Sequence, residues 1–274
     1  MSTRDGTRLT RVLRPRECFD PPVAVRREVV VARPSDETST RPPVLLVPGF
    51  GHGAWVYAEH WLEHVSERGF PASAMSLRGH GESGPAPEAD LRAYAHDVTQ
   101  VAAALPHQAV IIGHGAGALV VAMALARYPA RAGVLVAPVF GGIGAALAMA
   151  RRNPAGTLPG LFGGAVRLSG RQLFSRELAT AMAQEYVGRL GRASGGAQWE
   201  LVGRANPERP VGDPPVLVVG SPDDAVVPRA SLETVARRYG GAPLLFPGMG
   251  HDLMLDVRWR EPIDAICDWL EKLP

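Results

Sequence analysis

Short runs of consecutive apolar residues alternate with longer stretches whose apolar positions recur at helical spacing. Fully apolar runs are typical of parallel strands that are buried on both faces, and the longer stretches are typical of helices that cover them. The pattern predicts strands near residues 27–32, 44–47, 72–77, 109–112, 133–137, 216–219 and 243–246. Helices are predicted over residues 54–67, 90–104, 116–127, 230–239 and 261–273, with Asp90 as an N-cap. The alternation predicts an α/β protein with a mostly parallel sheet.

The alternation stops between residues 139 and 210, where apolar helical pieces are separated by glycine and proline. This stretch is too apolar for a linker, so we expect a helical cap over the carboxyl edge of the sheet, where open α/β sheets bind ligands. The predicted organisation is a loose N-terminal segment (1–25), an α/β core (26–138 and 211–274) and the cap (139–210). Apolar cap residues are expected to form the cap's own core more often than to line a pocket: Leu147, Met149, Leu161, Phe162, Phe174 and Met182.

Composition narrows the class of protein. Hydrophobic residues make up 46% of the chain and charged residues 20%, enough for a sizeable core, and the net charge of +2 is scattered, which disfavours a nucleic-acid partner.

We see no 18-residue apolar run and no apolar signal-peptide core in the first twenty residues. The two cysteines, Cys18 and Cys267, lie far apart and fit a reducing compartment. We therefore expect a cytoplasmic protein without a membrane span. The Ala, Gly, Pro and Arg content is typical of a GC-rich genome and is not a functional signal. A role in bacterial secondary metabolism is left open.

Four short motifs follow predicted strands in a fixed order. Residues 48–53 (PGFGHG) follow the strand 44–47, and residues 113–117 (GHGAG) join the strand 109–112 to the next helix. Residues 223–228 (DDAVVP) follow the strand 216–219, and residues 248–252 (GMGHD) follow the last strand. The carboxyl ends of parallel strands meet at one edge of a sheet, so we expect these loops to build one site there.

These motifs, in this order, resemble those of the α/β-hydrolase superfamily, in particular its cap-bearing esterase and lysophospholipase-like members. Residues 76–83 (SLRGHGES) also resemble a loop that these proteins carry, and residues 113–117 resemble their nucleophile elbow. The resemblance implies that His251 is the catalytic base and Asp224 its acid partner, with Asp223 as the alternative. It also implies an oxyanion hole made by the backbone N–H groups of Phe50 and Ala116. Where many relatives carry histidine before the first glycine, this chain has Pro48.

The resemblance places Gly115 where the serine nucleophile stands. Glycine has no hydroxyl to attack an acyl group, and removing the serine of a serine protease lowers turnover about 2 × 10⁶-fold. The turn itself should persist, because glycine adopts positive φ angles at little cost. A His251–Asp224 pair can still act as a general base. We therefore predict that this is not an ordinary serine esterase.

Further residues on the same loops are candidates for the pocket: His52, His80, His114 and Met249. We expect His114 to pack behind the elbow more readily than to catalyse, and Ser83 is a poor substitute nucleophile because it lies on a different loop. No histidine, cysteine and carboxylate cluster has metal-ligand spacing, and the glycines of residues 49–53 lack the dinucleotide-binding spacing. We expect no metal and no cofactor.

Three functions remain open at this point. The first is an enzyme that uses His251, Asp224 and the two N–H groups on a small hydrophobic carbonyl compound, lipid-like or polyketide-like. Its reaction would be proton abstraction with elimination or cyclisation, as in a lyase or cyclase, or cleavage by bound water. The second is a serine hydrolase in which Gly115 replaces a serine. The third is a non-catalytic binder of small molecules. Whether the chain is a monomer or a homodimer is left open.

Overall fold

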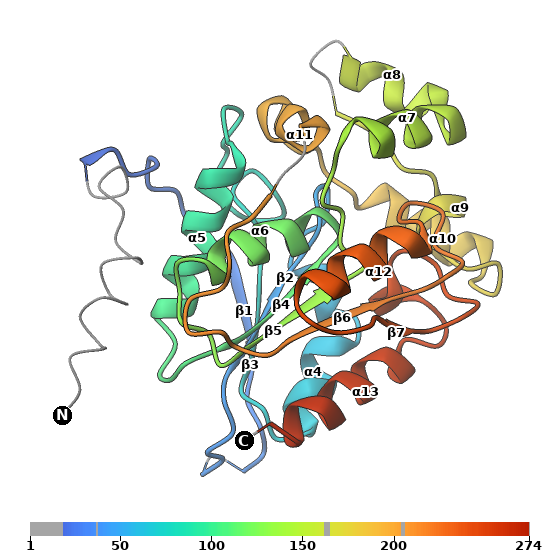
Figure 1. Ribbon diagram of the computed structural model, residues 1–274. Coiled ribbons are helices and arrows are strands. Elements are labelled where there is room, and N and C mark those ends of the chain that lie inside the picture. The colour runs from blue at the N-terminus through green and yellow to red at the C-terminus, as the bar shows by residue number, and fades with distance from the viewer. Residues whose placement is uncertain (1–18, 37, 162–164, 204–205, 274) are drawn as a thin grey trace.

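The computed structural model describes residues 19–36, 38–161, 165–203 and 206–273. One seven-stranded sheet runs through the molecule in the order β1-β3-β2-β4-β5-β6-β7 (Figure 1). Only β1 is antiparallel to its neighbour, and the other strands pair in parallel. The strands are Val29–Ala32 (β1), Val44–Val47 (β2), Ala72–Met75 (β3), Val110–His114 (β4), Ala132–Val136 (β5), Val216–Gly220 (β6) and Leu244–Leu245 (β7). The predicted α/β fold with a mostly parallel sheet is confirmed.

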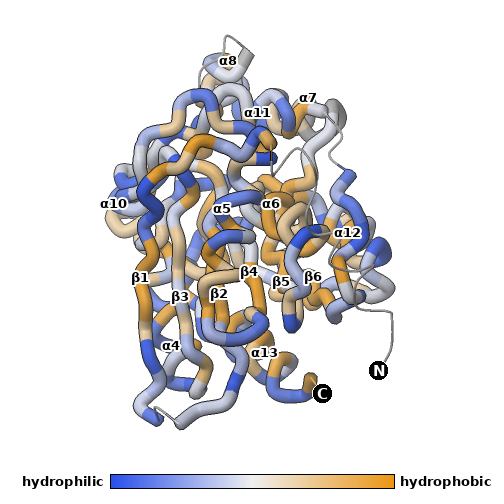
Figure 2. The backbone as a smooth tube through the Cα atoms, turned by 90° about the vertical axis from the view of Figure 1, so that its left-hand side faces the viewer, coloured by the Kyte–Doolittle hydropathy of each residue, from blue (hydrophilic) through white to orange (hydrophobic). Residues whose placement is uncertain are grey.

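Helices cover both faces of the sheet, which explains why the central strands are apolar throughout. Every residue of β2, β3, β4 and β5 is buried, and Figure 2 shows the central strands side by side among the more hydrophobic parts of the chain. Side chains alternate between the faces: Val44 and Leu46 belong to one hydrophobic cluster, and Leu45 and Val47 to the other. The first cluster contains helices Trp55–Ala58 (α3), Trp61–Glu67 (α4) and Arg260–Glu271 (α13), and the second contains Leu91–Ala103 (α5), Gly115–Leu125 (α6) and Arg229–Arg238 (α12).

One predicted helix is wrong in its extent. The stretch 54–67 forms two helices, α3 and α4, because His60 leaves the helical conformation with φ −147° and ψ −58°. The ring of His60 stacks on Trp259, with ring centroids 4.6 Å apart, so a contact from the far end of the chain accompanies the break. The predicted N-cap of α5 is confirmed, because the Asp90 carboxylate accepts a hydrogen bond from Ala93 N at 2.6 Å.

Between β5 and β6 lies a helical insertion, residues 139–210. Its described parts form helices and no strand of the sheet: Ile143–Arg152 (α7), Pro154–Leu161 (α8), Gly170–Leu173 (α9), Thr180–Gly188 (α10) and Gly195–Val202 (α11). In Figure 1, α7, α8 and α11 stand above the sheet at the top of the view. A backbone hydrogen bond from Gly191 N to Gly51 O, 2.7 Å long, ties the insertion to the loop after β2.

The apolar residues of the insertion do not share one environment. Leu147 and Met182 are exposed, so the expectation that they form a core of the insertion is wrong for these two. Phe174 is buried in a hydrophobic cluster that combines insertion residues such as Tyr186 with residues of the α/β core. Met149 lines the cavity described below. The side chains of Leu161 and Phe162 lie outside the described part of the structure, as do Cys18 and most of the predicted loose segment 1–25.

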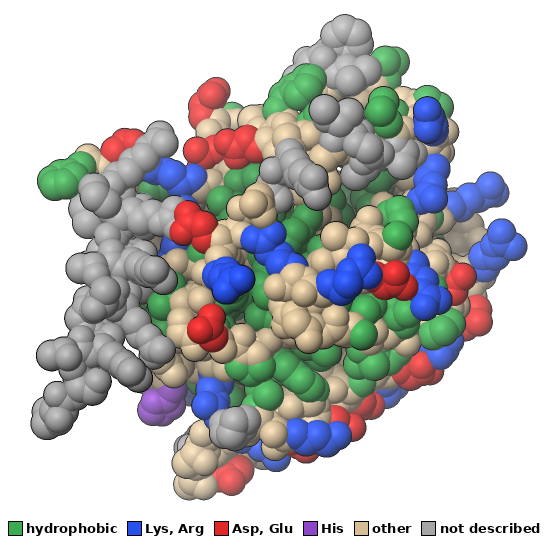
Figure 3. Space-filling model, in the orientation of Figure 1, with side chains coloured by type: hydrophobic (Ala, Val, Ile, Leu, Met, Phe, Trp, Pro, Cys, Tyr) green, Lys and Arg blue, Asp and Glu red, His purple; other side chains and the backbone are tan. Residues whose placement is uncertain are grey.

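The surface gives two further observations. None of the helices in the described ranges is long and apolar enough to cross a membrane. On the face drawn in Figure 3, arginine and lysine side chains are interspersed with aspartate and glutamate.

Candidate functional site

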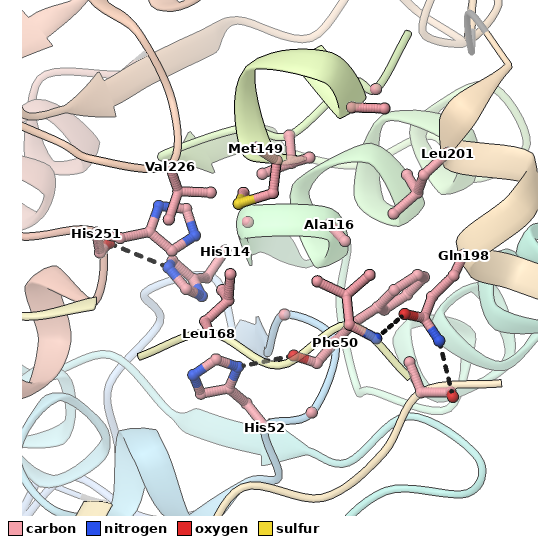
Figure 4. Close-up of a pocket in the computed structure, with 18 of the residues that line it drawn as sticks. Phe50, His52, His114, Ala116, Met149, Leu168, Gln198, Leu201, Val226 and His251 are labelled. Atoms are coloured by element: carbon pink, nitrogen blue, oxygen red, sulfur yellow. Dashed lines mark hydrogen bonds between the residues drawn. The ribbon is translucent and has the colours of Figure 1, made fainter. Parts of the chain in front are cut away.

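The loops that follow β2, β4, β6 and β7 meet at the carboxyl edge of the sheet, beneath the helical insertion. Together with the insertion they line a cavity of about 210 Å³ (Figure 4). Six of the predicted site residues line it: Phe50, His52, His114, Gly115, Ala116 and His251. Among the described residues that line the cavity, none is Asp, Glu, Lys or Arg. The cavity is therefore apolar, with a few polar atoms at its floor.

Gly115 forms a sharp junction between a strand and a helix. β4 ends at His114 in extended conformation, and α6 begins at Gly115 with φ +55°. A Cβ atom built on Gly115 would lie 3.2 Å from His251 Nε2 and 3.8 Å from Gly49 Cα. The turn is therefore aimed at the histidine, and a side chain at this position would project between the loops after β2 and β7.

The first turn of α6 packs directly against the loop after β2. A Cβ atom on Gly117 would lie 2.1 Å from Pro48 O, so only glycine permits this approach. The contact places the start of α6, including Ala116, beside Phe50. Backbone N–H groups in the first turn of a helix have no partner within the helix, and the helix dipole makes this end favourable for negative charge.

His251 and Asp224 form a buried pair at this edge. His251 Nδ1 lies 2.8 Å from Asp224 Oδ2, and the other carboxylate oxygen accepts hydrogen bonds from Val226 N at 2.6 Å and Val227 N at 2.9 Å. Asp223 is exposed and accepts instead from Gly248 N at 2.7 Å. Of the two neighbouring aspartates, only Asp224 therefore contacts the histidine. Its carboxylate fixes the Nδ1–H tautomer and turns Nε2 toward Gly115.

The charge state of His251 depends on opposing effects on its pKa. Burial lowers the pKa of His251, but the Asp224 carboxylate and its hydrogen bond raise it more, with a further contribution from Asp252, and the net shift is upward. The neutral form of His251, which can act as a base, is consequently favoured only at pH values above the usual pKa of histidine.

A second cluster of buried polar side chains lies beside this pair. His52 Nε2 is 3.0 Å from Asp252 Oδ2, and His52 Nδ1 is 3.1 Å from Phe50 O. His114 Nε2 is 3.2 Å from His251 O and 3.4 Å from Asp252 Oδ1. Burial and the neighbouring His251 lower the pKa of His114 to about 3, so its ring is neutral. Because Nε2 faces two acceptor oxygens, it carries the proton of that ring.

This cluster also bears on metal binding. Ligand-type atoms of His114, His251 and Asp252 all lie within 4.8 Å of one another. Each histidine, however, already donates one ring N–H to an oxygen of the protein. In the described part of the structure these side chains contact one another and neighbouring oxygens, and we describe the cluster as a hydrogen-bonded network.

Two predicted pocket residues lie elsewhere. His80 and Met249 are buried but are not among the residues that line the cavity. Ser83 donates to Ser76 O at 2.8 Å and accepts from Glu28 N at 2.9 Å, so its hydroxyl serves the fold. In the same loop, Arg78 makes two 2.7 Å contacts with the buried carboxylate of Asp97. The loop 76–83 is thus a structural connection.

Several lining residues have no local sequence signal. Val226 follows Asp224, and the insertion contributes Ala146, Met149, Val166, Leu168, Gln198 and Leu201. Gln198 is the polar member, but its Oε1 accepts from Val166 N and its Nε2 donates to Ala193 O and Ser194 O, so its amide holds the insertion together. Sequence reasoning also attached no role to Asp252, which follows His251 directly.

Residues 44–269 match the Alpha/beta hydrolase family, so the chain belongs to that family. A search of curated proteins found no match. Solved structures with the same fold include an esterase from Rhodococcus sp. ECU1013, with 21% identity, a TM-score of 0.69, and coverage of 90% of this chain and 95% of that one. A monoacylglycerol lipase from Paleococcus ferrophilus gives 18% identity and a TM-score of 0.66, over 92% of this chain and all of that one (100%). A bromoperoxidase from Bacillus anthracis gives 15% identity and a TM-score of 0.69, over 90% and 95%.

Proposed function

We propose that this chain is an α/β-hydrolase-fold enzyme without a serine nucleophile, in which His251, oriented by Asp224, acts as a general base. The observation that supports it is the position of His251 Nε2, which lies where the side chain of Gly115 would project. Gly115 occupies the place of the attacking serine, and the space that a side chain would fill is open to water or to substrate. General-base catalysis contributes about 10²–10⁴-fold.

The N–H groups of Phe50 and Ala116 are proposed to bind the oxygen that becomes negative during the reaction. Both residues line the cavity, and Ala116 lies in the first turn of α6. One such donor is worth about 3–4 kcal/mol of transition-state stabilisation. Together with a base, this suits an enolate, an alkoxide, or a carbonyl attacked by water.

The substrate is proposed to be a neutral, apolar carbonyl compound. The described lining holds no charged Asp, Glu, Lys or Arg to bind an ionic group, and most of it is aliphatic. The cavity of about 210 Å³ is smaller than the ~300–1,000 Å³ of most ligand pockets. This volume favours a small compound, or one end of a longer chain, in a bond cleavage, elimination or cyclisation. The helical insertion (139–210) is proposed to act as a cap over this pocket, and no cofactor enters the proposal.

The experiment is a comparison of metabolite consumption. A hydrophobic extract of the source organism is incubated with the protein and with His251→Ala, and the compounds are followed by mass spectrometry. His107→Ala, which changes an exposed histidine, is the matched control. We expect a compound that is consumed by the protein and by the control but not by His251→Ala. Equal consumption by all three would refute the general-base role, and retention of an unchanged compound by all three would indicate a binding protein.

A serine hydrolase carrying glycine at position 115 is the second candidate. The family and the esterase and lipase structures favour it, as does the aim of the Gly115 turn at His251 Nε2. Gly115→Ser tests it directly. If this substitution is labelled by a fluorophosphonate probe and is the only form that consumes the extract compound, the serine hydrolase is correct. Under our proposal, the unsubstituted protein consumes the compound without being labelled.

A further inference from the structure

Asp252 is a fully buried carboxylate that the proposed chemistry does not use. Its side chain has no solvent exposure, and burying an unpaired charge is costly enough that such groups acquire partners or lose the charge. Oδ2 lies 3.0 Å from His52 Nε2, and Oδ1 lies 3.4 Å from His114 Nε2, beyond its hydrogen bond to His251 O. His52 is therefore the principal partner of Asp252.

The protonation state of the His52 ring follows from the groups that its two nitrogens face. His52 Nδ1 faces the carbonyl oxygen of Phe50, which can only accept a hydrogen bond. His52 Nε2 faces Asp252 Oδ2, which also only accepts when the carboxyl group is ionised. Burial acts to raise the pKa of Asp252, but His52, His114 and His251 outweigh it and hold that pKa below its usual range. With an ionised Asp252, both ring nitrogens of His52 must carry protons.

We propose that His52 and Asp252 form a buried imidazolium–carboxylate pair that positions the loop of Phe50 against the loop of His251. The pair deepens the proposed function, because it assigns two positioning residues to the same site. His52 and Asp252 are 200 residues apart in sequence, and the backbone of Asp252 is continuous with that of the base. One ion pair thus connects the two loops that supply the proposed oxyanion donor and the base.

The hydrogen bond between His52 and the Phe50 carbonyl explains how the His52–Asp252 pair would affect the proposed oxyanion site. The loop 49–53 contains three glycines, and Gly51 has φ +82°, so its peptide groups can rotate at little cost. A donated hydrogen bond from His52 Nδ1 keeps the Phe50 carbonyl fixed (Figure 4). A carbonyl oxygen that turned toward the cavity would repel a developing negative charge. The pair therefore holds the peptide that follows Phe50, and with it the backbone next to the proposed donor, the Phe50 N–H.

The pair also acts on the charge of His251. The groups that face His251 are Asp224 from the loop after β6, Asp252 from its own loop and His114 at the end of β4. His52 in turn faces Asp252, His114 and His80, and Tyr57 also lies within electrostatic reach of Asp252. A positive His52 offsets much of the negative charge that Asp252 presents to the base.

The first test uses the unsubstituted protein and needs no activity. Histidine labelled with ¹⁵N is incorporated, and the ring nitrogens are observed by two-bond ¹H–¹⁵N correlation between pH 6 and 9. We expect both nitrogens of His52 to show the protonated signature, with assignment by comparison with His52→Gln. An unprotonated Nε2 in His52 would overturn the proposal, because the pair would then be a neutral hydrogen bond.

The second test compares two substitutions by the titration of His251 in the same spectra. Asp252→Asn removes a negative charge and should lower the midpoint of His251. His52→Gln removes a positive charge and should raise the midpoint, and the double substitution should return it toward the original value. Asp213→Asn, at an exposed site, is the control for loss of a charge. A midpoint that His52→Gln leaves unchanged contradicts the charge pair. Because no substrate is involved, failure of this proposal is distinguishable from failure of the proposed function.

Discussion

The two His–Asp pairs contain the same two kinds of side chain and differ in what their remaining atoms meet. In His251–Asp224, the carboxylate is satisfied by Val226 N and Val227 N, and the free ring nitrogen of the histidine faces the cavity. In His52–Asp252, both ring nitrogens are occupied by acceptor oxygens. Under our proposals, the first pair exchanges a proton and the second retains one. Residue identity alone does not define a catalytic dyad, because the partner of the second nitrogen decides its chemistry.

The largest difference between the pairs should appear on removal of each histidine. His251→Ala should lower turnover by about 10²–10⁴-fold, because it removes the general base. His52→Gln should lower it much less, since His52 does not touch the reacting atoms. Both rates are measured on the compound that the extract experiment identifies. Equal losses in the two variants would mean that the two pairs do not have separate roles.

Filling the space at position 115 tests the geometry of the first pair. Gly115→Ala places a methyl group 3.2 Å from His251 Nε2, where we propose that water or substrate lies. If the methyl group displaces the reacting atoms by about 1 Å, the rate should fall about 10²-fold. The positive φ adds about 1–3 kcal/mol of strain, which thermal denaturation will report separately. A rate unaffected by the methyl group would show that the reaction does not use this space.

Substitution of Asp252 should mainly reduce stability, whereas substitution of Asp224 should mainly reduce turnover. Asp252→Ala leaves the buried imidazolium of His52 without its partner, and breaking such a pair costs about 3–5 kcal/mol of unfolding free energy. Asp224→Asn keeps the shape of the first pair and should mainly reduce turnover, because the tautomer of His251 is no longer fixed. Denaturant unfolding and kinetics on both variants measure the contrast. A lower free energy of unfolding for Asp224→Asn than for Asp252→Ala would contradict this contrast.

The smallest effect concerns pH. The pKa of His251 is raised above its usual value, so its base form is lost as the pH falls through that raised value. Turnover should therefore decline on the acid side, with a midpoint above that of an ordinary histidine, about 6.5. Asp252→Asn should move this midpoint toward lower pH. A profile that is flat from pH 6 to 9 would contradict the role of His251 as base.

The sequence predicted the strands and the convergence of the loops well, because short apolar runs and the residues that follow them are local signals. The resemblance favoured Asp224 over Asp223, but only the structure shows that Asp224 is the one that contacts His251. The break at His60 could not be foreseen, since Trp259 stacks on it from 199 residues away along the chain (259 − 60).

The same limit applies to the rest of the site. The insertion residues that line the cavity follow no motif, because they are defined by which faces of short helices meet the loops. The pairing of His52 with Asp252 joins two distant loops and depends on the complete fold. The motifs and the resemblance predicted the His251–Asp224 pair, whereas the role of Asp252 and the partners of His52 and His114 come from the structure alone.

The hydrogen bond from Gly191 N to Gly51 O has a consequence for how the site opens. It joins the insertion to the carbonyl of Gly51, the residue after Phe50, within the loop that His52 contacts from the other side. Any movement that lifts this part of the insertion must either break the bond or pull that loop with it. Substrate entry and assembly of the proposed anion-binding groups would then be coupled. The protein with this part of the insertion lifted would be inactive.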